Sequence, residues 1–340
     1  MTPTPAPAPA AARARLDEID LAKGLAIALV VWGHIVAGDT PAGNAWYGHS
    51  KHFVYLFHMP FFMFLSGVVA GYGYRPVAGV AEWLSFAHKK LVRLLPAYVL
   101  FGVLIVVGKL VASRYVYVDN IPPSLWAGLW DVLTQPLNSG AKSLWFIYVL
   151  FLFYLTLHPW MALFGQRLLP LLAVGLVLQF VQAPEVLLLG TYAKFLLFFA
   201  LGLGAGRHYT ALRAALARWG APSVLLFALA LATVYRVPQL PSKLIAGLFS
   251  IPALLYLVGR LRAPAALDAL RFLGRYSFVI YLLNTIFIGV IKAIGLKLTP
   301  WDGAAFLLFA PALFAGGLLL PVLTKRWLFA RVAYLDRITQ

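Results

Sequence analysis

Apolar runs of about twenty residues recur along the whole chain, and this repetition restricts what the chain can fold into. A run of that length is what an α-helix needs to cross the roughly 30 Å hydrocarbon layer of a bilayer. The chain is 62% hydrophobic and 11% charged, whereas a soluble domain is typically about 25% charged. The pattern therefore predicts an all-α, polytopic integral membrane protein.

Ten such runs can be placed in the sequence. They cover residues 19–37, 52–72, 91–112, 143–163, 168–181, 189–206, 222–235, 244–259, 277–294 and 304–323. The fifth run is short and contains Pro170, but the basic residues support it. With ten spans and an inner N-terminus most Lys and Arg lie in the inner connections, and this bias disappears when the fifth span is removed. We therefore expect about ten transmembrane helices with both termini cytoplasmic.

The segments outside these runs are short. Residues 1–15 are rich in Pro and Ala, which predicts a disordered cytoplasmic tail, and residues 16–340 form a single transmembrane domain. The longest outer loop, 113–142, carries Trp126 and Trp130 and is suited to lie on the membrane interface. A formal net charge of +17 would suggest nucleic acid in a soluble protein, but here membrane orientation explains the charge and no nucleic acid partner is expected.

Ionisable residues interrupt the first two runs. Lys23 and His34 are eleven residues apart, so on a helix they share a face and stand about 16 Å apart along the axis. The second run returns in the opposite direction, which brings His58 close to the depth of His34. Asp20 precedes Lys23 by three residues and can pair with it. Such groups are costly inside a bilayer and mark functional sites, and His is suited to proton transfer near neutral pH.

Each of these residues also has a simpler explanation. A lone His in a span can bond a neighbouring helix, Asp20 and Lys23 can form an ion pair at a helix start, and Lys194 can extend to the interface. A proton-coupled transporter or a flippase of a sugar-related substrate could also use these five residues, which are Asp20, Lys23, His34, His58 and Lys194. The chain lacks matching Gly- or Pro-broken segments in two halves, which favours an enzyme over this alternative.

Two early segments carry a resemblance to a known family. They are DLAKG leading to VVWGH, residues 20–34, and FHMP leading to SG, residues 57–67. Together they resemble integral-membrane acyltransferase family 3, the O-acyltransferases of bacterial cell-surface sugars. Lys23 stands where most of that family has Arg, and in this respect the chain resembles the branch related to fucose 4-O-acetylases.

Later segments resemble the same family in the same order. The matches are Phe86, Lys90, Arg93, Pro96 and Tyr98 around the start of the third span, Leu144-Trp145-Phe146, Leu273-Gly274-Arg275-Tyr276-Ser277 and Tyr281-Leu282-Leu283. The chain departs from the family pattern at Asn284, where the family commonly has His. An amide at this position can hydrogen-bond a substrate hydroxyl.

The resemblance implies an O-acyltransferase in the bacterial inner (cytoplasmic) membrane. It would move an acyl group, usually acetyl from acetyl-CoA, to a hydroxyl of a cell-surface glycan or lipid-linked sugar. His34 would act as general base, with His58, Asp20 and Lys23 completing the catalytic set. A covalent acetyl-His34 intermediate and direct transfer both remain open. The depth of His34 favours an acceptor on the outer side, and a cytoplasmic lipid-linked sugar is the alternative.

The same resemblance and the positions of the charges predict the binding residues. Lys90 and Arg93, three apart at a cytoplasmic helix start, are expected to hold the CoA phosphates together with Arg275. The residues assigned to substrate binding are Ser66, Trp145, Tyr281 and Asn284. No metal is expected, because His34 and His58 lack a carboxylate at ligand spacing.

Overall fold

α-Helices make up nearly all of the structure, a computed structural model that describes residues 17–116, 118–237 and 241–339. Within these ranges there are thirteen α-helices and no strand, which confirms the predicted all-α class. The helices are α1 (Asp17–His34), α2 (Ala45–Tyr72), α3 (Val80–Ala112), α4 (Leu125–Thr134), α5 (Trp145–Leu163), α6 (Leu168–Val177), α7 (Leu189–Arg207), α8 (Tyr209–Arg236), α9 (Ser242–Arg260), α10 (Pro264–Arg275), α11 (Ser277–Leu298), α12 (Phe306–Trp327) and α13 (Ala333–Ile338). The predicted tail, 1–15, lies outside the described residues.

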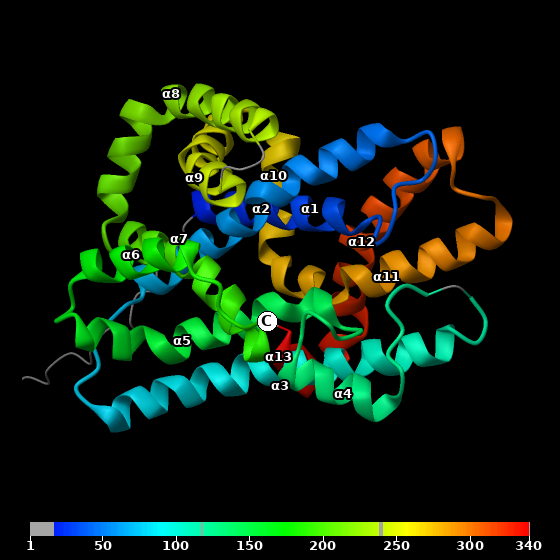
Figure 1. Cartoon of the computed structure of the whole chain (residues 1–340), viewed down its shortest axis with the longest axis horizontal. Helices are drawn as coiled ribbons and strands as arrows, with labels where there is room; N and C mark the ends of the chain where they lie inside the picture. Colours follow the sequence, from blue (N-terminus) through cyan, green and yellow to red (C-terminus); the bar gives the residue numbers. More distant parts are fainter. Residues whose placement is uncertain (1–16, 117, 238–240, 340) are drawn as a thin grey trace, which may run out of the picture.

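Each of the ten predicted runs overlaps one of these helices, as expected for a polytopic membrane protein. The prediction that Lys90 and Arg93 lie at a helix start is wrong, because α3 already begins at Val80 and contains both. Among the described residues, eight helices are long and apolar enough to cross a bilayer by length and composition. The other two runs are α1, which carries acidic residues in its first turn, and α6, a shorter apolar helix that continues to Phe180. Although α1 is charged, it packs against α2, α9, α10, α11 and α12 and lies inside the bundle (Figure 1).

Glycines allow α2 and α7 to pack in close backbone contact. Gly67 and Gly71 on α2 face Gly202 and Gly206 on α7, and a Cβ at any of the four would lie 2.0 to 2.1 Å from a carbonyl oxygen of the other helix. Pairs of small residues four apart are a common way for membrane helices to approach closely. This contact fixes the position of α2, which carries His58.

A second close approach joins α1 to α10. A Cβ on Gly24 would lie 2.0 Å from the carbonyl oxygen of Leu270, and a Cβ on Gly274 would lie 2.0 Å from that of Asp20. Because Arg275 follows Gly274 directly, the contact brings the end of α10 beside the first turn of α1. Close helix packing therefore explains why glycine stands at position 274 in Leu273-Gly274-Arg275-Tyr276-Ser277.

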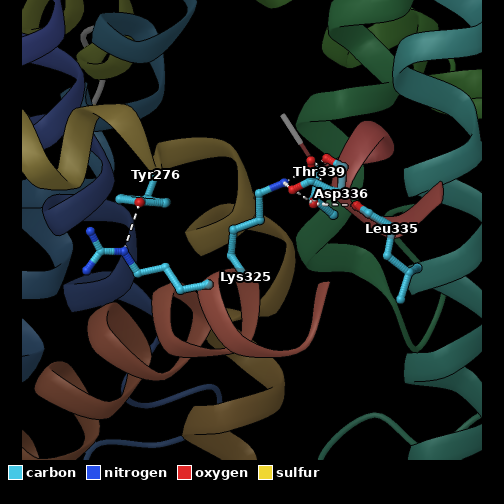
Figure 2. A network of polar contacts seen from close by, with 6 residues as sticks. Tyr276, Lys325, Leu335, Asp336 and Thr339 are labelled. Carbon is cyan, nitrogen blue, oxygen red and sulfur yellow. Dashed lines mark hydrogen bonds and ion pairs between the residues drawn. The ribbon is translucent and has the colours of Figure 1, made fainter. Parts of the chain in front are cut away.

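The C-terminal segment is tied to the rest of the bundle by polar contacts (Figure 2). Lys325 near the end of α12 donates hydrogen bonds to the carbonyl oxygen and Oδ1 of Asp336, each at 2.7 Å, and to Thr339 Oγ1 at 3.0 Å. Arg326 Nε donates to the hydroxyl of Tyr276 at 3.1 Å, between α10 and α11. These bonds connect α12 both to the C-terminal segment, which packs on α3, and to the start of α11.

The spans alternate in direction, which gathers their ends at two sides of the bundle. We call the side where α1 begins and α5 ends the inner end, and the side where α1 ends and α5 begins the outer end. By the distribution of basic residues, the inner end is the one predicted to be cytoplasmic. The predicted outer loop holds α4, on which Trp126 and Trp130 are 79% and 66% exposed, as suits an interfacial segment.

Candidate active site

A cavity of about 700 Å³ opens among α1, α2, α3, α5 and the α10–α11 junction at the inner end. The charged residues that line it within the described chain are Lys23, Arg75, Lys89, Lys90, Arg93, Arg275, Asp20 and Glu82. Six bases against two acids leave an excess of four positive charges. A cavity with this charge attracts polyanionic ligands such as those that carry several phosphates.

Seven of the residues predicted as functional lie in the wall of this one cavity. They are Asp20, Lys23, Ser66, Lys90, Arg93, Arg275 and Tyr281. Lys90 Nζ lies 4.1 Å from the ring centroid of Tyr154 and 5.3 Å from that of Phe86, so aromatic faces hold the ammonium group at the wall. Lys23 Nζ lies 3.5 Å from Asp20 Oδ1, as the three-residue spacing predicted.

His34 lies at the other end of α1, where side chains of α2 hold the helix terminus. Tyr47 donates its hydroxyl to the carbonyl oxygen of Trp32 at 2.7 Å, and Tyr55 donates to that of Gly33 at 2.8 Å. Lys51 Nζ donates to the carbonyl oxygen of Val36. Carbonyls at a helix C-terminus lack partners within the helix, so these bonds fix the backbone on both sides of His34.

Asn284 on α11 determines which nitrogen of His34 carries the proton. Its Nδ2 donates to the carbonyl oxygens of Ile280 and Tyr281, both at 2.9 Å, so its Oδ1 is the atom that faces His34 Nδ1 at 2.7 Å. An amide oxygen only accepts, so Nδ1 of His34 is the protonated nitrogen. Nε2 then carries the lone pair, as a general base requires. All three of these hydrogen bonds join the Asn284 amide to other protein atoms.

The tautomer of His58 is also fixed by a hydrogen bond to Nδ1, in this case within its own helix. Its Nδ1 lies 2.7 Å from the carbonyl oxygen of Val54, so this nitrogen is the donor and Nε2 carries the lone pair. Tyr55 connects the two histidines, because its ring stacks on His58 at 4.9 Å while its hydroxyl bonds Gly33 beside His34. The sequence analysis did not single out Tyr55, although its place three residues before His58 on one helix face was a usable signal.

Three aromatic rings of the cavity wall pack together, and we call them the aromatic layer: Phe62, Phe146 and Tyr281. The ring of Phe146 lies 4.9 Å from that of Phe62 and 5.3 Å from that of Tyr281. The Tyr281 hydroxyl donates to the carbonyl oxygen of Ser143 and accepts from Phe146 N at 3.1 Å. Tyr281 lines the cavity, and Asn284 follows it by three residues, roughly 4.5 Å of helix rise. Asn284 and His34 are not part of the cavity wall, so we infer that the layer lies between them and the cavity.

Some predicted residues lie outside the cavity wall. Neither histidine lines it, and the ring of Trp145 stacks on Phe195 at 5.2 Å instead. Lys194, for which the sequence allowed extension to the interface, is exposed and pairs with Glu185 at 3.4 Å. Within the residues that the structure describes, no group of three or more His, Asp, Glu or Cys side chains is arranged to hold a metal ion.

The sequence analysis missed His158 of α5, which lines the inner cavity and is 4% exposed. It lies in the aromatic run YLTLHPW, with no charged residue at helical spacing to mark it. Arg75 and Lys89 were missed as well, because the sequence does not indicate which residues of a basic connection turn toward a cavity.

Comparison with known proteins agrees with the motifs. A family model described as an acyltransferase domain, that of acyltransferase family 3, matches residues 16–326, which is most of the chain. No curated protein and no solved structure matches. The match includes the segment of Lys23 and His34, the segment of His58 and the basic cavity wall. The chain therefore belongs to acyltransferase family 3 and is a membrane acyltransferase.

Proposed function

We propose that the protein transfers an acyl group, acetyl in the simplest case, from acyl-CoA to a hydroxyl of a cell-surface glycan or lipid-linked sugar. The protein would be a multi-pass enzyme of the bacterial inner membrane, with the donor at the inner end and the acceptor at the outer end. The observation that carries the proposal is the pairing of a strongly basic inner cavity with His34, whose tautomer is set by Asn284, three residues beyond the cavity-lining Tyr281 on α11.

The inner cavity suits the donor because CoA carries its negative charge on phosphates at one end. Lys90, Arg93 and Arg275 supply cations from two different elements, and guanidinium groups pair with phosphate oxygens in two-pronged geometry. The acyl arm would then extend along the wall that contains Lys23 and Ser66. The ion pair with Asp20 would orient the Lys23 ammonium beside this arm.

The reaction itself would use Nε2 of His34. As the acceptor oxygen forms a bond to the acyl carbon, Nε2 takes the hydroxyl proton, the carbon–sulfur bond breaks, and the proton passes on to the thiolate of CoA. Asn284 Oδ1 would hold the Nδ1 proton in place and stabilise the imidazolium that forms. The role we assign to Asn284 is therefore to position His34 rather than to bind the acceptor.

The aromatic layer must open for the acyl group to reach His34. Tyr281 is bonded to both Ser143 and Phe146 of the opposite segment, whereas the Phe62 ring has no polar atom to hold it. We expect Phe62 to be the ring that moves. A closed layer in the absence of acceptor would keep the thioester apart from His34 and from water that His34 could activate.

Transfer of labelled acetate from acetyl-CoA to envelope glycan by purified protein in lipid tests the proposal. His34→Ala should lower transfer about 100-fold or more, the usual contribution of a general base. His49→Ala is the matched control, because His49 is an exposed histidine at the outer end of α2. Near-normal transfer by His34→Ala would refute the role of His34. Proton-linked sugar uptake without acetyl transfer would instead favour the transporter.

A further inference from the structure

His158 is a buried imidazole with an unpaired nitrogen in the wall of the inner cavity. It is 4% exposed, and its Nδ1 has no hydrogen-bond partner in the part of the chain that the structure describes. Buried polar atoms are almost always paired, and leaving one unpaired is destabilising. His58, in a comparable place on α2, bonds the carbonyl oxygen four residues earlier, whereas His158 Nδ1 does not bond that of Tyr154.

Aromatic rings, rather than polar contacts, hold the imidazole of His158. Tyr74 stacks on it at 5.3 Å, and Phe86 meets it edge-on at 4.5 Å. Tyr74 is itself fixed, because its hydroxyl donates to Gln166 Oε1 at 2.7 Å. Burial raises the pKa of the Tyr74 hydroxyl, which stays protonated as this donor. The ring of His158 is thus prepositioned while one of its nitrogens is unpaired.

The tautomer of His158 follows from the unpaired atom. A buried N–H without an acceptor is rarer and less tolerated than a lone pair without a donor. The proton therefore belongs on Nε2, which becomes the hydrogen-bond donor of this side chain. Because the residue lines the cavity, this donor is available to a ligand that fills it.

Depth along α5 indicates which part of the donor reaches His158. The Tyr154 ring lies under Lys90, so it marks the level of the proposed phosphate site. His158 lies four residues, roughly 6 Å, nearer the inner end than Tyr154. Phe146, at the aromatic layer, lies eight residues, roughly 12 Å, in the opposite direction. With the acyl arm directed toward Phe146, the nucleoside end of the donor lies on the side of His158.

We propose that His158 is a binding residue for the adenosine part of the acyl donor, to which it donates a hydrogen bond from Nε2. Arg75 follows Tyr74 directly and lines the same cavity, which places a cation near the ribose phosphate. The inference rests on the proposed assignment of this cavity to acyl-CoA. It adds a nucleoside subsite that the family motifs of the chain do not contain.

Calorimetry with two ligands separates this subsite from the rest of the cavity. Acetyl-CoA contains the adenosine, and acetyl-4′-phosphopantetheine lacks it. His158→Phe keeps a ring against Tyr74 and Phe86 but removes both nitrogens, so it should weaken acetyl-CoA binding about tenfold and leave binding of the shorter ligand unchanged. His158→Gln retains an N–H donor and should recover part of the affinity. His88→Phe, an exposed position of α3 outside the cavity wall, should change neither.

Thermal unfolding without ligand distinguishes a binding role from a structural one. His158→Phe removes an unpaired buried nitrogen, so the midpoint temperature should stay the same or rise. Unchanged acetyl-CoA affinity, equal loss for both ligands, or a lowered midpoint would overturn the role of His158. If the unmodified protein binds neither ligand, the donor assignment of the cavity fails, and this inference fails with it. If it binds both and only the effect of His158→Phe is missing, the proposed function stands without the subsite.

Discussion

Replacing Asn284 tests whether the chain sets the tautomer of its catalytic histidine. Asn284→Leu keeps a similar volume but removes the acceptor that lies 2.7 Å from His34 Nδ1. A buried hydrogen bond to a group that becomes charged contributes about 1.5 to 3 kcal/mol. If that contribution is made in the transition state, kcat should fall roughly 10- to 150-fold. Asn284→Asp retains an acceptor for His34 Nδ1 but loses the Nδ2 donor to the carbonyl oxygens of Ile280 and Tyr281, so it should recover only part of the activity.

The effect should appear in kcat and not in donor binding, because the aromatic layer lies between Asn284 and the cavity. Steady-state transfer of labelled acetate gives kcat, and calorimetry gives the acetyl-CoA affinity. Thr285→Val is the matched control, since Thr285 neighbours Asn284 on α11 and contacts Ser143 Oγ at 3.2 Å. Near-normal kcat in Asn284→Leu, or a loss confined to donor affinity, would refute this reasoning.

Three further changes test the donor site, the second histidine and the aromatic layer. Replacing both Lys90 and Arg93 by Ala should weaken acetyl-CoA binding and make it less dependent on salt. Calorimetry at two ionic strengths measures both effects, and unchanged affinity would place the CoA phosphates elsewhere. His58→Ala should lower kcat less than His34→Ala does, and equal losses would mean that the two histidines act as a unit. Phe62→Ala should raise acetyl-CoA hydrolysis in the absence of acceptor, measured as released thiol, because the layer would no longer keep the thioester from His34 and the water that His34 can activate. An unchanged rate would argue against a closed layer.

The helices could be predicted because the length of an apolar run is a local property of the sequence. Even the short and Pro-containing run 168–181 coincides with helical structure, with α6 at 168–177 followed by a 3-10 turn. The charges of α1 did not prevent a buried helix, since it is covered by five neighbours. The helices α4, α10 and α13 were not predicted, because none of them is an apolar run of spanning length.

The site was predictable where its residues share a helix and less so where they meet across the fold. The three-residue spacing of Asp20 and Lys23 predicted their contact, whereas the hydrogen-bond partner of His34 is 250 residues away on α11. Residue type also left the role of Tyr281 open. It lines the cavity, yet its hydroxyl holds the start of α5 through Ser143 and Phe146. Such contacts depend on tertiary packing, which no local pattern encodes.

On the proposed function, acyl groups pass from a donor at the inner end to an acceptor at the outer end through His34. Vesicles with the protein in one orientation, labelled acetyl-CoA at the inner end and acceptor glycan at the outer end, measure this directly. The unmodified protein should give labelled glycan at the outer end, and His34→Ala should give about 100-fold less. Labelling only when donor and acceptor share one side, or equal labelling by His34→Ala, would contradict it.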